Sequence, residues 1–133
     1  QRFEQKGLKL AGVKMMTLDE AVLREHYSHL TDKPFFGDLN DFMQSSPVIA
    51  MCWEGLSVID TVRRITGITK AREAEAGSIR GDFAMSVSCN VIHASDTVEN
   101  AELEVKRFFS DDELFAYDKS EYAHVYATDE RAQ

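Results

Sequence analysis

Hydrophobic residues follow two different periods along the chain, and these periods separate strand-like from helix-like segments. Residues 8–16 mix leucine, valine and methionine with lysines and small residues, which predicts a strand with one covered face. Residues 48–53, VIAMCW, are apolar without interruption, which predicts a strand buried on both faces. The remaining periodic segments have the 3.6-residue repeat of amphipathic helices. The pattern therefore indicates one mixed domain of sheet and helices, without fixing its topology.

Capping residues mark where helices are expected to begin and end. Boxes of the Ser/Thr-x-x-Asp/Glu kind at 17–20, 57–60 and 110–113 predict three helix starts. We expect the first helix to run to about Leu30 and the second to end at Gly67. Residues 1–6 are typical of the last turn of a helix, because Gly7 follows as a left-handed cap. Residues 117–126 are expected to form an extended tail, and residues 129–133 to be disordered or exposed to solvent.

The segment from Asn90 to Asp96, NVIHASD, carries the candidate chemistry. His93 closes a short apolar run and precedes a helix over residues 97–109, so we expect a strand to hold it near the positive end of a helix dipole. On that helix, Glu104 falls at the edge of the apolar stripe, whereas Leu103 points outward. Glu104 is either a partner of His93 or a surface carboxylate, and periodicity leaves both open.

Composition and charge narrow the function. The 133 residues suit one domain, and the net charge of -8, from 15 basic and 23 acidic residues, argues against binding nucleic acid through its phosphates. A phosphate ligand would therefore have to meet a local cluster of arginines. No apolar run is long enough to cross a bilayer and no leader opens the chain, so we expect a cytoplasmic protein with no membrane partner.

Cysteine and histidine spacings give little sign of a metal site. Cys52 and Cys89 are expected to be small buried hydrophobes rather than a disulfide or metal ligands. His26 and His29 stand three apart on a helix, but with no third ligand at a matching spacing a solvated helix face is the better interpretation. A zinc module through Cys89 and His93 would need more ligands than the spacing provides.

The motif Asn90-x-x-His93-x-Ser95-Asp96, together with GSIRGDF at 77–83 and KPFF at 33–36, resembles the nucleoside diphosphate kinase family. The resemblance runs in register from Arg2 to about Tyr126. It implies an α+β fold with a four-stranded antiparallel sheet of ferredoxin-like βαββαβ topology covered by helices, over a single domain of residues 1–133. It also implies transfer of the γ-phosphate of a nucleoside triphosphate to a nucleoside diphosphate, with a phosphohistidine at His93.

The resemblance assigns further roles residue by residue. Glu104 and Ser95 would hold the His93 ring, and Tyr27 would support it. The nucleotide would be bound by the set Phe35, Leu39, Arg63, Thr69, Arg80, Val87 and Asn90, with the base between the first two. Mg²⁺ would arrive with the nucleotide phosphates and need no ligand from the chain. The family implies a homo-oligomer, a hexamer rather than a tetramer.

The chain departs from the family pattern in three places. Ala94 stands where glycine is common, and Cys89 stands where an arginine often precedes the asparagine. Family members also begin with a strand and a Lys-Pro-Asp segment whose lysine touches the transferred phosphate. We expect the natural protein to have this segment before Gln1. The alternative is a non-catalytic nucleotide-binding or structural family member that lacks the lysine.

Overall fold

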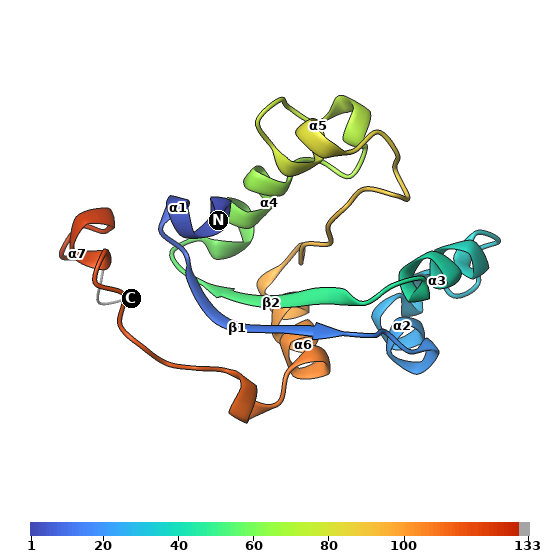
Figure 1. Ribbon diagram of the computed structural model, residues 1–133, viewed down its shortest axis with the longest axis horizontal. Helices are drawn as coiled ribbons and strands as arrows, with labels where there is room; N and C mark the ends of the chain where they lie inside the picture. The colour runs from blue at the N-terminus through green and yellow to red at the C-terminus, as the bar shows by residue number, and fades with distance from the viewer. Residues whose placement is uncertain (131–133) are drawn as a thin grey trace.

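The computed structural model describes residues 1–130, apart from the side chain of His29, and is centred on a two-stranded antiparallel sheet (Figure 1). Helices α2 and α3 gather at one end of the two strands, α1 and α4 lie at the other end, and α6 overlaps the strands in this view. In chain order the helices and strands are α1 Arg2–Lys6, β1 Lys9–Met16, α2 Glu20–His26, α3 Phe36–Gln44, β2 Val48–Glu54, α4 Val58–Thr66, α5 Ile79–Phe83, α6 Val98–Phe108 and α7 Tyr122–Val125. Short 3₁₀ helices occupy Ser28–Leu30, Ala71–Glu73 and Asp111–Glu113.

The register of the sheet leaves one of its faces open. Val13 pairs with Met51 and Met15 pairs with Ile49, and all four side chains are exposed, Met15 by 71%. Successive strand residues point to opposite faces, so these four lie together on one face. The prediction that residues 48–53 are buried on both faces is therefore wrong for the described chain, because nothing described covers this side of β2.

The chain after α6 runs along β1. The Ala11 carbonyl, at the irregularity between Leu10 and Gly12, accepts a hydrogen bond from the backbone N–H of Phe115 at 2.8 Å. Tyr117 Oη donates to the Leu10 carbonyl at 2.8 Å. The α+β class is confirmed. The described residues contain two strands, so they do not confirm the four-stranded sheet.

The core sits where the sheet meets its helices and the tail. Leu8 is 2% exposed, Leu23 on α2 is 0% and Phe109 after α6 is 8%. Gly12 is required by a close approach, because a Cβ at this position would lie 2.9 Å from the Glu113 carbonyl oxygen and from a Leu114 methyl. The chain that follows α6 is thus packed closely against β1 at Gly12.

Several helix ends fall where the sequence predicts them. Gly7 caps α1 with φ 105°, α4 ends at Gly67, and the Thr97 hydroxyl accepts from the Asn100 N–H at 3.1 Å to begin α6. At the 110–113 box, the Glu113 carboxylate accepts from the Ser110 N–H at 3.0 Å.

Other helix boundaries differ. α2 begins after Asp19, whose carboxylate accepts from the Val22 N–H at 2.8 Å, rather than after Thr17. Leu18 is 4% exposed, so its burial delays the helix by two residues. The helix also ends at His26 instead of Leu30, and Ser57 precedes α4 in a left-handed conformation without a side-chain cap.

The last part of the chain is only partly extended, because residues 122–125 form α7. Asp129 and Glu130 are exposed as expected, and the rest of the predicted exposed end, residues 131–133, lies outside the described residues. None of the described helices combines the length and apolarity needed to cross a membrane.

Candidate functional site

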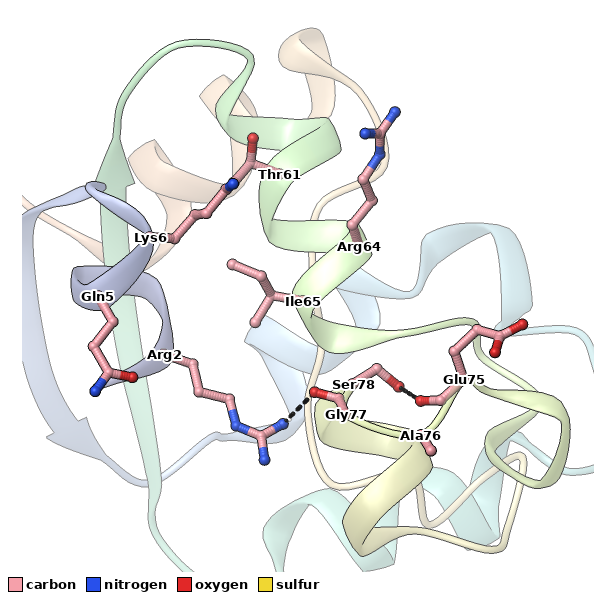
Figure 2. Close-up of a pocket in the computed structure, with 10 residues that line it drawn as sticks. All are labelled: Arg2, Gln5, Lys6, Thr61, Arg64, Ile65, Glu75, Ala76, Gly77 and Ser78. Carbon is pink, nitrogen blue, oxygen red and sulfur yellow. Dashed lines mark hydrogen bonds between the residues drawn. The ribbon is translucent and has the colours of Figure 1, made fainter. Parts of the chain in front are cut away.

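A pocket of about 700 Å³ opens between α1, α4 and the loop before α5, and it contains none of the predicted site residues (Figure 2). Arg2 spans part of it by donating to the Gly77 carbonyl at 2.8 Å, and Ile65 points into it from α4. Its lining is Arg2, Gln5, Lys6, Thr61, Arg64, Ile65, Glu75, Ala76, Gly77 and Ser78. The chemistry of the chain therefore has to be sought elsewhere, around His93.

The segment that carries His93 is a tight turn and not the predicted strand. Val91 has φ 74°, and the Ile92 N–H donates to the Asn90 carbonyl at 2.9 Å, which is the rare form of the γ-turn. A positive φ is costly for a β-branched residue and persists only where surrounding contacts impose it. Here the Ile92 carbonyl accepts from the buried guanidinium of Arg80, a contact that helps to hold the turn.

His93 is held by Glu104 of α6. Its Nε2 lies 3.1 and 3.2 Å from the two carboxylate oxygens, and Ser95 Oγ donates to the same carboxylate. A carboxylate only accepts, so Nε2 carries the ring proton and Nδ1 keeps its lone pair. The Glu104 side chain is 18% exposed, which decides the open question in favour of a partner for His93. Leu103 is 58% exposed, as predicted.

The electrostatics of Glu104 follow from this geometry. Burial alone would raise the pKa of Glu104, but the hydrogen bonds from His93 and Ser95 and the two nearby imidazoles outweigh it and hold the pKa at about 2. Tyr27 lies in the same environment: burial raises the pKa of its hydroxyl, and the negative charge of Glu104 raises it further. The predicted group of His93, Glu104, Ser95 and Tyr27 is therefore brought together.

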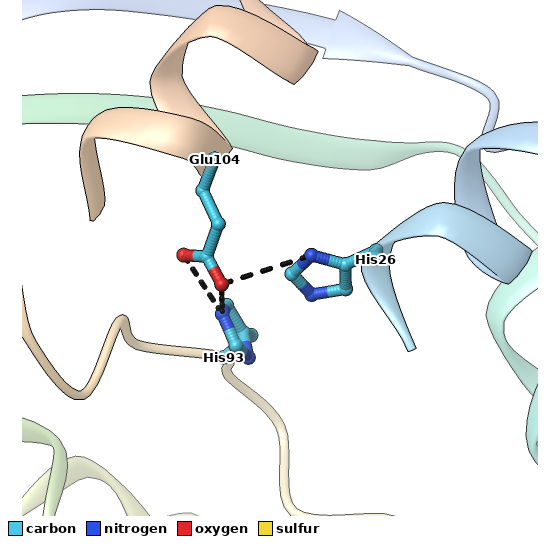
Figure 3. A group of neighbouring side chains, drawn as sticks. All are labelled: His26, His93 and Glu104. Carbon is cyan, nitrogen blue, oxygen red and sulfur yellow. Dashed lines mark hydrogen bonds and ion pairs between the residues drawn. The ribbon is translucent and has the colours of Figure 1, made fainter. Parts of the chain in front are cut away.

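His26 joins this group from α2 (Figure 3), although its spacing predicts a solvated helix face. That expectation is wrong, because its side chain is only 5% exposed. Its ring lies edge-on to those of Tyr27 and His93, at centroid distances of 4.5 and 4.6 Å. The sequence does contain a signal for this burial: His26 lies three residues after the fully buried Leu23, on the same helical face.

His26, His93 and Glu104 are also close enough to hold a metal, with ligand atoms all within 4.8 Å of one another. The neighbouring Arg107 opposes this use, because its Nη1 lies 3.2 Å from Nδ1 of His26. A guanidinium can only donate, so the lone pair that a metal would need is already engaged. Cys89 is not part of this group, which gives no support to a zinc site through Cys89 and His93.

Arg80 connects two loops beneath the site. Its side chain is 6% exposed, and it donates to the Gly67 carbonyl at 2.7 Å and to the Ile92 carbonyl next to His93. Burial lowers the pKa of Arg80, and the positive charge of Arg63 lowers it further. Arg63 therefore lies near enough to Arg80 for their charges to interact.

The structure separates Arg63 from its neighbour Arg64. A hydrogen bond from Asn100 lowers the pKa of Asp96, and the charge of Arg63 contributes to the lowering. Arg63 thus lies on the side of Arg80 and Asp96, near the His93 turn. Arg64 lines the other pocket.

The remaining predicted nucleotide-binding residues are exposed or half-buried. Phe35 is 49% exposed and precedes α3, one turn from Leu39, whose N–H donates to the Phe35 carbonyl at 3.1 Å. Thr69 is exposed, and Asn90 Nδ2 donates to the carbonyl of the 45% exposed Val87 at 2.7 Å. Within residues 1–130, no hydrogen bond, ion pair or ring contact joins Phe35, Leu39 or Thr69 to His93.

The first 114 residues of the chain match a known protein family, nucleoside diphosphate kinase. A nucleoside diphosphate kinase from Parabacteroides distasonis is 53% identical over 129 residues, which cover 97% of this chain and 84% of the relative. Nucleoside diphosphate kinase 3 of Danio rerio is 45% identical over 127 residues, which cover 96% of this chain and 75% of that protein.

Solved structures agree with these relatives. The halophilic nucleoside diphosphate kinase of Halobacterium salinarum, solved with CDP, superposes with a TM-score of 0.91 at 44% identity and covers 95% of this chain and 84% of its own. A nucleoside diphosphate kinase of Encephalitozoon cuniculi gives a TM-score of 0.89 at 41% identity, covering 95% and 85%.

Proposed function

The chain belongs to the nucleoside diphosphate kinase family, and we propose that it transfers the γ-phosphate of a nucleoside triphosphate to a nucleoside diphosphate through a phosphohistidine at His93. The observation that carries this proposal is the fixed orientation of one imidazole. Glu104 accepts from Nε2 of His93, so Nδ1 offers a lone pair on a ring that cannot turn freely.

The reaction proceeds by two displacements at phosphorus. Nδ1 of His93 attacks the γ-phosphorus of the triphosphate, the bond from that phosphorus to the β,γ-bridging oxygen breaks, and the first diphosphate leaves. A terminal oxygen of a second diphosphate then attacks the phosphohistidine, and the P–N bond breaks. Glu104 keeps the ring aligned in both steps through Nε2, and Ser95 fixes Glu104. Such positioning is the main demand of phosphoryl transfer.

Positive charge near His93 would stabilise the transferring group. Arg63 is the exposed arginine of this region, and it interacts electrostatically with Arg80 and Asp96. Arg80 has two of its guanidinium nitrogens engaged by backbone carbonyls, so in this proposal it fixes the His93 turn and offers its remaining N–H groups to phosphate oxygens.

Mg²⁺ fits this proposal as an ion carried by the nucleotide. The described metal-capable group of the chain, His26, His93 and Glu104, supplies two nitrogens and one carboxylate, whereas Mg²⁺ prefers oxygen ligands. The phosphate oxygens of the substrate would hold the ion. When bound, it would neutralise part of the phosphate charge.

Phe35 and Leu39 would bind the base, with Thr69, Val87 and Asn90 around the sugar and phosphates. The half-exposed ring of Phe35 and the neighbouring Leu39, one helical turn away, support this assignment. Contact with an aromatic face tolerates any base, which accounts for a broad choice of nucleotides. The Halobacterium relative, whose structure contains CDP, supports nucleotide binding by this fold.

A non-catalytic role is not favoured, because the relatives carry the kinase name and Glu104, Ser95 and Tyr27 are in place around His93. The full proposal includes the four-stranded ferredoxin-like sheet, a cytoplasmic location and a homo-oligomer, with a hexamer favoured over a tetramer. The extended chain along β1 supports a larger sheet, and the open apolar face of Val13, Met15, Ile49 and Met51 supports association.

The test is a steady-state assay that follows CTP formation from ATP and CDP by chromatography. Parallel lines in double-reciprocal plots against each substrate are expected for two displacements through one site. His93→Ala should abolish turnover, whereas His124→Ala, which changes an exposed histidine on α7, should not. Intersecting lines, or turnover that survives in His93→Ala, would contradict the proposal.

A further inference from the structure

His26 is the neighbour of the proposed nucleophile that no predicted role accounts for. It ends α2 with its side chain 5% exposed, and its ring packs edge-on against Tyr27, His93 and Phe108 at centroid distances of 4.5, 4.6 and 5.3 Å. A titratable ring this close to His93 can change the charge around the reacting group. What its nitrogen atoms contact therefore matters.

Two groups of α6 face the same nitrogen of His26. Nδ1 lies 3.2 Å from Nη1 of Arg107 and 3.7 Å from Oε1 of Glu104. Arg107 can only donate, so this hydrogen bond requires the lone pair of Nδ1. A protonated Nδ1 would instead repel Arg107 and donate to Glu104. The two states exclude each other.

The Glu104 oxygen that faces His26 is also the nearer of the two oxygens that accept from His93. Glu104 Oε1 lies 3.1 Å from Nε2 of His93, so protonated His26 would compete with His93 for this atom. Arg107 is fixed in its place, with its side chain 14% exposed and its Nε donating to Glu25 at 2.9 Å. The position of the Arg107 guanidinium thus determines whether Nδ1 of His26 is unprotonated or protonated.

We infer that Arg107 is a positioning residue: by donating to Nδ1 of His26, it keeps this imidazole from drawing the Glu104 carboxylate away from His93. The inference rests on the proposed role of His93 as nucleophile. Arg107 touches no reacting atom in this scheme and acts through His26 and Glu104.

The charges around His26 set the expected response to pH. The titratable and charged groups that face it include Glu104 and Arg107 of α6, His93 of the turn before α6, and the adjacent Tyr27, while Glu25 pairs with Arg107. Without Arg107, Glu104 becomes the charged group closest to Nδ1, so His26 takes up a proton more readily.

The first measurement is the pH profile of kcat/KM for Arg107→Leu, which keeps much of the aliphatic bulk and removes the donor. We expect the acid limb to move up by about one pH unit, because a charge some 3 Å from Nδ1 is removed, and the plateau above pH 8 to stay within about threefold of wild type. Arg107→Lys, which retains a donor, should restore the limb to within about half a unit.

Arg107→Leu in a His26→Phe background distinguishes an effect through the His26 nitrogen atoms from an effect on packing. Phenylalanine keeps the ring contacts but has no nitrogen, so Arg107→Leu should no longer move the acid limb. Arg24→Leu serves as the matched control, because Arg24 is an exposed cation of α2 that pairs with Glu20 at 2.7 Å. An equal shift in both backgrounds, or a shift in the control, would overturn the inference.

An NMR titration of the His26 ring C–H resonance needs no activity and so distinguishes the two proposals. In Arg107→Leu the ring should titrate about one pH unit higher than in wild type. A protein without kinase activity that still shows this shift would refute the proposed function alone. Unchanged titration in a variant that urea denaturation shows to be folded would refute the role of Arg107.

Discussion

Nε2 of His93 lies 3.1 Å from the nearer carboxylate oxygen of Glu104, although the two residues come from different parts of the backbone, a strained turn and the middle of α6. This contact fixes the ring and leaves Nδ1 as the reactive nitrogen. Substitutions of Glu104 and of the arginines near the His93 turn therefore test the geometry of the site.

Replacing Glu104 with glutamine should slow phosphoryl transfer. The amide has one oxygen and no negative charge, so it holds the His93 ring in the Nε2–H form less firmly. Loss of alignment is expected to lower the rate of enzyme phosphorylation by about 10- to 100-fold. Rapid-quench measurement of the first turnover checks this. Glu102→Gln, an exposed change on the same helix, should leave the rate as it is, and equal rates for both variants would rule out this role.

Acid should remove the contribution of Glu104 to stability. Its pKa is lowered from the ordinary 4.5 to about 2 in the folded chain, so its stabilisation is complete above pH 4.5 and lost as the pH falls towards 2. The difference in free energy of unfolding between wild type and Glu104→Gln should thus shrink by on the order of 2 kcal/mol between pH 6 and pH 3. Urea titrations at both pH values measure this difference, and a constant gap would contradict the assigned contact.

Arg80 and Arg63 should differ in how much they contribute to stability. Arg80→Ala leaves the carbonyls of Gly67 and Ile92 without their donor, and we expect a loss of about 2–4 kcal/mol in the free energy of unfolding. Arg63→Ala, at an exposed position, should change stability by less than about 0.5 kcal/mol but raise KM for the nucleotide. Denaturation curves and nucleotide titrations distinguish the two, and the assignment fails if Arg63→Ala binds nucleotide normally.

Phe35→Ala should weaken binding of every nucleotide by a similar factor. Stacking on an aromatic ring contributes about 1–3 kcal/mol per base, so Kd should rise at least about fivefold for purine and pyrimidine diphosphates alike. Calorimetric titration with ADP and CDP measures the Kd of each nucleotide. Phe42→Ala provides the control, because Phe42 is 46% exposed on α3, the helix that Phe35 precedes, and it should bind like wild type. A matching loss in both variants would point to damage to α3 instead.

Local spacing was enough to predict the parts of the site that lie on one helix. The 100° advance per residue places Glu104 at the rim of α6 and Leu103 outward, and the structure agrees. The turn at Val91 could not be predicted this way, because a positive φ at valine is imposed by distant contacts such as that of Arg80 with Ile92. Burial of His26 likewise depends on α6 packing against α2. The exposed face of β2 could not be predicted either, because it depends on which elements pack against the strand.

Phosphorylation of His93 is tested by isolating the protein after incubation with γ-labelled ATP and no acceptor. We expect about one acid-labile phosphoryl group per chain, located at His93, absent from His93→Ala and discharged as a triphosphate when CDP is added. A His93→Ala protein that still acquires the label, or a wild-type protein that turns over nucleotides without ever carrying it, would contradict the account.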